Sequence, residues 1–297
     1  MRPAAPHALP IPAAPGEVAT DTPDSAMHAL SSLRRRRAAM RGSAPKMLLV
    51  SLATVAAALA AWGIATQTGL VRPLFLPRPD SVLKAFADAV DGRIDGAPLL
   101  DHVAMSLLRV AGAFVLAALI GIPVGLATGL NPILRAVLDP FIEFYRPLPP
   151  LAYLPLVIIW FGIGETSKIL LIFLACFAPV ALAARAGVAA ASADQINAAR
   201  ALGASRLQVV RHVVLPAALP DILVGLRIGM GVGWTTLVAA EMVAASTGIG
   251  QMVLNASNFL RTDIVIMGIL VIGALAGAFE FGMRRLERRL TPWKGKV

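Results

Sequence analysis

The chain has 297 residues, of which 57% are hydrophobic and only 15% are charged, and its mean hydropathy is +0.74. These values exclude an ordinary water-soluble domain and indicate a protein of the lipid bilayer. The formal net charge of +10 resides in tails and loops between apolar runs, so membrane topology explains it better than nucleic-acid binding. The single cysteine, Cys176, excludes an intramolecular disulfide, and no metal site is predicted.

The N-terminal segment, residues 1–46, is predicted to be a disordered cytoplasmic tail. It is rich in Pro, Ala and Ser and has few large apolar residues at helical or strand spacing. The basic run 34–37 precedes the first apolar stretch, so a long signal peptide is an alternative. Residues 47–297 are predicted to form one transmembrane domain, because several further apolar segments follow.

Six segments approach the about 17–25 apolar residues that a spanning helix needs. They are residues 47–66, 110–130, 148–163, 169–184, 222–245 and 264–279. They predict an all-α, polytopic bundle of six transmembrane helices.

The distribution of Lys and Arg predicts the orientation of these helices. The N-terminal tail, the loop 185–212 and the end from Arg284 are basic, whereas the connection 71–105 has more acidic than basic residues. Because basic loops stay in the cytoplasm, both termini are predicted to be cytoplasmic in a multi-pass inner-membrane protein. Within that connection, apolar residues at helical spacing from Val82 to Val90 predict a short amphipathic helix, either on the membrane face or packed over the bundle.

The loop between the fourth and fifth predicted spans has the residues for two helices, within residues 190–216. Ser192 and Gln195 form a capping box, and Gly203 suits the left-handed residue that ends a helix. Ser205 can cap a second helix, and Pro216, following Leu215, is expected to turn the chain into the fifth span. The prediction is a helix, a sharp turn and a second helix on the cytoplasmic surface.

This loop resembles the cytoplasmic "EAA" loop of permeases in ATP-binding-cassette importers, which docks into the ATPase subunit. Asn197 stands where that motif has its glutamate, so an ion pair from this position is not implied. The coupling residues that the resemblance implies are Asn197, Ala198, Ala199, Gly203, Leu215 and Pro216.

The resemblance extends from about residue 73 to the C-terminus and is closest to the sulfonate, nitrate and taurine branch, taurine permeases in particular. The segments that carry it are 74–77, 144–150, 160–168, 231–241 and 288–293. It implies a type I importer permease that transports taurine or a related small alkanesulfonate. The implied partners are a second copy in a homodimer, a cytoplasmic ATPase subunit and a periplasmic substrate-binding protein.

The chain itself is not expected to be an enzyme or to bind a cofactor. The resemblance places ATP and Mg on the partner subunit, and the glycine-rich stretch 162–168 lacks the order of a phosphate-binding loop. Two alternatives remain open: the same architecture carrying nitrate or another small anion, or an ion-coupled secondary transporter. The second would show paired broken helices or inverted repeats, and the sequence has no internal repeat.

Charges inside predicted spans are candidates for the translocation path, because ionised groups are costly in hydrocarbon. Arg227 and Glu241 are 14 residues apart in the fifth predicted span, about 21 Å in a continuous helix. Arg227 is expected in the cytoplasmic half of the path or its gate, and Glu241 in the outer vestibule. Between them, Trp234, Thr235 and Thr236 offer an aromatic wall and hydroxyls to a passing sulfonate, although such side chains more often serve helix packing.

Overall fold

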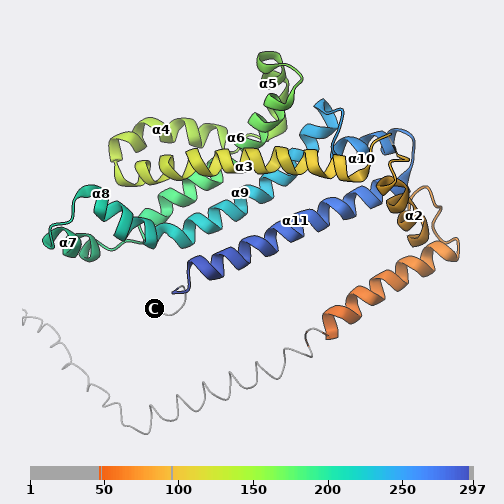
Figure 1. Ribbon diagram of the computed structural model, residues 1–297, viewed down its shortest axis with the longest axis horizontal. Helices are drawn as coiled ribbons and strands as arrows, with labels where there is room; N and C mark the ends of the chain where they lie inside the picture. Colours follow the sequence, from red (N-terminus) through yellow and green to blue (C-terminus); the bar gives the residue numbers. More distant parts are fainter. Residues whose placement is uncertain (1–46, 48, 95, 294–297) are drawn as a thin grey trace, which may run out of the picture. The chain divides into compact units, whose positions relative to one another are not determined.

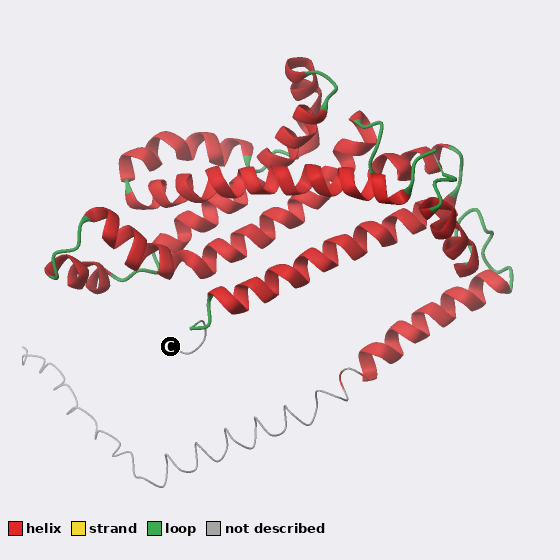
Figure 2. Cartoon of the chain, in the orientation of Figure 1, coloured by secondary structure: helices red, strands yellow, loops and turns green. Residues whose placement is uncertain are grey.

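The computed structural model describes residues 47, 49–94 and 96–293, which are helical with short connections and contain no strand (Figure 1; Figure 2). The chain divides into two units, Met1–Trp62 and Gly63–Val297. The described part of the first unit begins an apolar helix, Leu49–Gln67, of spanning length. The predicted disordered tail, residues 1–46, lies outside the described residues.

The second unit is built from helices of very different lengths. Four continuous helices in this unit are long enough to span a membrane: Leu99–Leu130, Glu165–Val188, Arg206–Ala244 and Thr262–Leu290. The elements are α2 (Pro79–Val90), α3 (Leu99–Leu130), α4 (Pro132–Tyr145), η1 (Pro150–Ala152), α5 (Leu154–Phe161), α6 (Glu165–Val188), α7 (Ala193–Ala201), α8 (Arg206–Val209), η2 (Val210–Val214), α9 (Leu215–Ala244), α10 (Ile249–Asn258) and α11 (Thr262–Leu290).

The core of this unit is the packing of α6 against α3 and α9. Small residues allow the backbones to approach closely, as is usual between helices in membranes. A Cβ atom at Gly125 of α3 would overlap the carbonyl oxygen of Ala181 in α6, and one at Gly225 of α9 would overlap the Cβ of Ala183. These contacts depend on the absence of a side chain at both glycines.

Helices α3 and α6 run in the same direction. Arg109, in the first half of α3, contacts Glu165 at the start of α6, and Gly129 near the end of α3 lies against Val188 at the end of α6. The chain between them must therefore return along the bundle. It does so through α4, η1 and α5, in more than one piece.

The third predicted span, residues 148–163, is consequently not one helix. It contains η1 and α5; the eight residues of α5 reach only about 12 Å at 1.5 Å per residue. Pro149 and Pro150 lack the amide protons that a continuous helix needs, and Gly162 ends α5 with a φ of 77°. These helix-breaking residues divide the segment, so the described residues contain five helices of spanning length and not the six predicted. We interpret the segment as part of an interrupted return path.

The loop between α6 and α9 forms the two predicted helices, α7 and α8. We call these helices and the turn between them the elbow (residues 192–209). Ser192 and Ser205 each make a capping box, with Gln195 and Gln208, and Gly203 has a φ of 84°. The capping and turn predictions are thus confirmed.

The predicted turn at Leu215 and Pro216 is wrong. The helix runs without a break from Arg206 to Ala244, with a π-helical stretch at Val210–Val214. A proline inside an α-helix removes one hydrogen bond, and its ring clashes with the carbonyl one turn earlier; the wider π turn just before Pro216 makes room for the ring. The second helix of the elbow, α8, is therefore the first part of the continuous helix that ends in α9.

The predicted amphipathic helix is α2, which packs against α11. Its buried residues are Val82, Ala85 and Ala89, whereas Leu83 and Phe86 are exposed. Of the two readings of this helix, the structure supports packing over the bundle.

Candidate functional site

The elbow presents an exposed apolar surface at the turn between α7 and α8. Leu202 is 90% exposed and Leu207 is 76% exposed. Leu202 lines a hollow of about 370 Å³, together with residues that include Ala199, Gly203 and His212. Large apolar side chains gathered at a rigid turn are typical of a surface that another protein covers.

The predicted coupling residues do not all lie on this surface. Asn197 and Ala198 are exposed on α7, and Ala199 is half-buried, packed with other apolar side chains where the elbow meets α9. Leu215 and Pro216 are half-buried within the first turn of α9. The structure therefore brings the α7 residues and Gly203 together at the elbow. Leu215 and Pro216 lie apart from them, at the start of α9.

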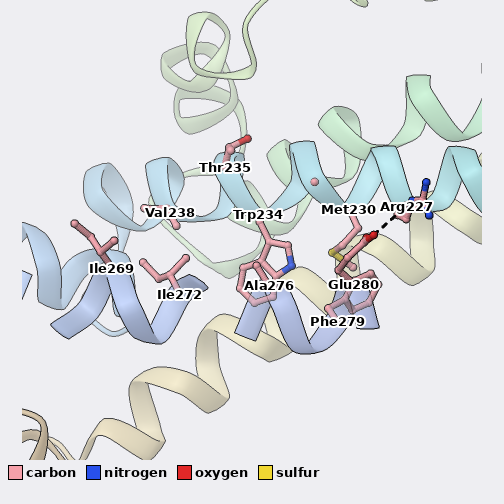
Figure 3. A pocket seen from close by; sticks show the side chains of 11 residues that line it. Arg227, Met230, Trp234, Thr235, Val238, Ile269, Ile272, Ala276, Phe279 and Glu280 are labelled. Atoms are coloured by element: carbon pink, nitrogen blue, oxygen red, sulfur yellow. Dashed lines mark ion pairs between the residues drawn. The ribbon is translucent and has the colours of Figure 1, made fainter. Parts of the chain in front are cut away.

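A cavity of about 600 Å³ lies between α9 and α11 (Figure 3). Most of its lining is apolar, and its charged groups are Arg227 of α9 and Glu280 of α11. The Arg227 Nε lies 3.7 Å from a Glu280 carboxylate oxygen, and its Nη1 lies 3.5 Å from Glu287. Arg227 thus has a polar environment at one end of an apolar cavity.

The three polar residues predicted to lie beside the path differ in position. Trp234 lines the cavity and is 6% exposed, and its buried indole Nε1 has no hydrogen-bond partner among the described residues. Thr235 also lines the cavity, and its hydroxyl donates to the Val232 carbonyl at 2.8 Å. Thr236 is buried and donates to the same carbonyl at 2.9 Å. Of the three, only Trp234 has an unused donor.

Glu241 is fully buried, at the opposite end of α9 from the elbow. One carboxylate oxygen accepts from the Arg109 guanidinium at 2.8 Å and from the Ser106 hydroxyl at 2.7 Å. The other accepts from the Gly250 amide at 2.9 Å. A carboxylate with these three donors is fixed in place. The sequence predicts Glu241 in the outer vestibule. In the structure, its carboxylate is instead enclosed by these donors and is not open to a vestibule within this chain.

The cluster around Arg109 contains a second carboxylate. Arg109 donates two hydrogen bonds to Glu165, at 2.6 and 2.8 Å, and one to the Thr247 carbonyl at 2.5 Å. Lys168 also donates to Glu165, at 2.7 Å, and is 4% exposed. Two cations and two carboxylates thus neutralise one another where α3, α6 and α9 meet.

The cluster also holds the connection between α9 and α10. Gly248 has a φ of 145°, and a Cβ atom there would lie 2.5 Å from the Glu241 carboxylate. Its amide lies 3.1 Å from His102 Nδ1, and the Ser106 hydroxyl accepts from the Ile249 amide at 3.0 Å. We call these residues the α3–α9 lock: His102, Ser106, Arg109, Glu165, Lys168, Glu241 and Gly248.

Sequence reasoning missed the α3 members of the lock, because the second predicted span was begun at Val110, one residue after Arg109. A usable signal was present. His102, Ser106 and Arg109 are spaced by four and three residues, so they lie on one face of a helix. Polar residues aligned in this way next to an apolar run indicate a buried polar network.

Comparisons with known proteins agree with this architecture. The family described as binding-protein-dependent transport system inner membrane component matches residues 99–292. The taurine transport system permease protein TauC of Escherichia coli K12 is 54% identical over 267 residues, covering 89% of this chain and 97% of that protein. The putative aliphatic sulfonates transport permease protein SsuC of Bacillus subtilis 168 is 35% identical over 236 residues, covering 80% and 84%.

A solved structure of the MetNI methionine ABC transporter in an inward-facing conformation has the same fold. The TM-score is 0.57 at 22% sequence identity, and the match covers 65% of this chain and 96% of the other. This similarity confirms the helical fold that the sequence predicted.

Proposed function

This chain belongs to the family of binding-protein-dependent transport system inner membrane components, and on that premise we propose that it forms the translocation path for taurine. It is a multi-pass inner-membrane permease subunit of an ATP-binding-cassette importer for taurine or sulfonates, with a type I importer permease fold. The observation that carries the choice of taurine is the 54% identity to the taurine permease across nearly its whole length.

Transport by this subunit requires partners that supply energy and substrate. A cytoplasmic ATPase subunit docks on the elbow, where Leu202 and Leu207 offer apolar anchors around the turn at Gly203. ATP and Mg bind to that subunit. A periplasmic binding protein delivers substrate to the opposite end of the bundle, and two copies of the chain enclose the path.

The orientation follows from this assignment. The elbow and the basic end of α11, which includes Arg288 and Arg289, lie in the cytoplasm, as basic loops do. The α3–α9 lock then lies at the periplasmic end, beside the connection from α9 to α10. Both chain termini are cytoplasmic in this arrangement.

The proposal is tested in proteoliposomes that contain this chain, its cognate ATPase and taurine-loaded binding protein. We expect ATP hydrolysis to be stimulated by the loaded binding protein, and taurine to accumulate inside. Gly203→Asp should abolish the stimulation, since it adds a charged side chain at a positive φ on the docking surface. Gly203→Asn, which tolerates this backbone conformation and adds no charge, is the matched control and should retain most of it.

A well-assembled complex that imports another small anion but not taurine would overturn the substrate assignment. A complex in which Gly203→Asp and Gly203→Asn hydrolyse ATP like the original chain would overturn docking at the elbow. Both variants must first be shown to insert into the membrane at the level of the original chain.

A further inference from the structure

The cavity between α9 and α11 contains one pair of opposite charges, Arg227 and Glu280, at one end of an apolar wall (Figure 3). We propose that this pair recognises an aminosulfonate zwitterion by both of its charges, the sulfonate on Arg227 and the ammonium on Glu280. The inference rests on the proposed function and adds a specificity-determining site to it.

The pair is held loosely enough to open for a ligand. The distance of 3.7 Å between Arg227 Nε and Glu280 exceeds that of a hydrogen bond, and the two side chains are 37% and 35% exposed. By contrast, the Arg109–Glu241 pair of the lock is 2.8 Å long and almost fully buried. A ligand that inserts between Arg227 and Glu280 therefore gives up little existing interaction.

Each charge of the pair is oriented by a neighbour outside the cavity. The Arg284 Nε donates to Glu280 at 2.7 Å, and Glu287 lies 3.5 Å from the Arg227 Nη1. Neither Arg284 nor Glu287 lines this cavity; both line an adjacent pocket. These contacts hold the guanidinium and the carboxylate in place while leaving the cavity side of each available.

The chemistry of taurine matches this arrangement. It has a sulfonate and an ammonium group joined by two carbons, so both charges must be satisfied within a short distance. A guanidinium donates several hydrogen bonds to an oxyanion in a fixed geometry, and a carboxylate accepts from an ammonium. A ligand with both groups replaces one long ion pair by two charge-assisted interactions.

Trp234 supplies a further donor to the same place. Its indole Nε1 is buried without a partner in the described part of the chain, and Figure 3 shows this nitrogen on the side of the ring nearer to Glu280. A buried donor without an acceptor costs free energy until a ligand supplies one, and a sulfonate oxygen is such an acceptor. The indole face also suits an ammonium group, because the ring attracts cations.

The consequence is selection against sulfonates that lack the ammonium group. For 2-hydroxyethanesulfonate, which differs from taurine by a hydroxyl in place of the ammonium, Glu280 offers no charge pairing and repels the sulfonate. One charge-assisted hydrogen bond corresponds to a difference in affinity of about tenfold to a hundredfold.

The test measures binding by calorimetry to the permease–ATPase complex in lipid nanodiscs, without the binding protein, so that only the membrane complex selects. Taurine and 2-hydroxyethanesulfonate are titrated to tens of millimolar. We expect the original chain to prefer taurine by at least about tenfold. Glu280→Gln should lower the affinity for taurine to that for 2-hydroxyethanesulfonate, and Arg227→Gln should weaken both ligands.

Asp263→Asn is the matched control, because it removes a carboxylate from the ion pair with Arg261 on the same helix, outside the cavity, and should leave the preference unchanged. The proposal is overturned if the original chain binds the two sulfonates equally or binds neither, or if Glu280→Gln keeps the preference for taurine. Taurine uptake by the same complex with its binding protein is measured in parallel. Uptake without a preference in the calorimeter refutes only the Arg227–Glu280 site, whereas no uptake refutes the proposed function.

Discussion

Removing Arg109 should be among the most destabilising single changes in the described bundle. Its side chain and that of Glu241 are 2% and 1% exposed, so Arg109→Met leaves a buried carboxylate with only Ser106 and the Gly250 amide as donors. Breaking a buried ion pair by removing one partner costs about 3–5 kcal/mol. We expect Arg109→Met to lower the free energy of unfolding by this amount.

The reverse change should cost less, because Arg109 has a second carboxylate partner. Glu241→Gln leaves the two hydrogen bonds between Arg109 and Glu165 intact, and we expect a loss of about 1–3 kcal/mol. The double variant should be less destabilised than the sum of the two by about 0.5–3 kcal/mol, since the buried charge and its partner are removed together.

These differences can be measured by reversible unfolding in mixed micelles of increasing SDS content, followed by circular dichroism. The control is Arg261→Gln, which removes an Arg that is 53% exposed and pairs with Asp263; exposed pairs contribute about 0–1 kcal/mol. The reasoning is refuted if Arg109→Met costs no more than Arg261→Gln, or if the losses of the two lock variants simply add.

Three further predictions concern packing, backbone and topology. Gly125→Val should prevent assembly of the bundle, because its side chain would overlap the α6 backbone, whereas Gly273→Val meets nothing within 4 Å and should fold; size-exclusion profiles in detergent distinguish them. Gly248→Ala should cost at least about 1–2 kcal/mol, measured by the same SDS titration, because its φ is positive and its Cβ meets the buried carboxylate. Cysteines at Asn131 and Ile163 should react with an impermeant maleimide from opposite sides of the membrane; labelling from one side would refute the interrupted return path.

Local chemistry explains which parts of the fold could be predicted. The elbow depends on capping side chains and on Gly203, all within a few residues of the backbone that they fix, so its two helices could be derived from the sequence. The failure at Pro216 has a different origin, because local chemistry does not decide the outcome there. A proline forbids one hydrogen bond, but whether the chain turns or widens into a π turn depends on the packing of Val209 and Val214, which are buried.

The candidate site required contacts that no local pattern contains. Arg109 and Glu241 are 132 positions apart in the chain, and their pairing exists only because α3 and α9 meet across α6. The free-energy cost of placing an ionised group in the membrane indicated both Arg227 and Glu241 as candidates. The structure separates them into an accessible cavity and a sealed lock, a distinction that depends on the neighbours of each residue.

The unbroken helix from the elbow to the lock has a mechanical consequence. Its 39 residues form a rod of about 58 Å, with the elbow at one end and Arg227 and Trp234 on its flank. A tilt or twist imposed on α8 is therefore transmitted to the cavity wall without an intervening hinge loop. The π turn at Val210–Val214 is the irregular segment of this helix, and a change there in hydrogen-bond register would alter how far a rotation of α8 turns the cavity wall.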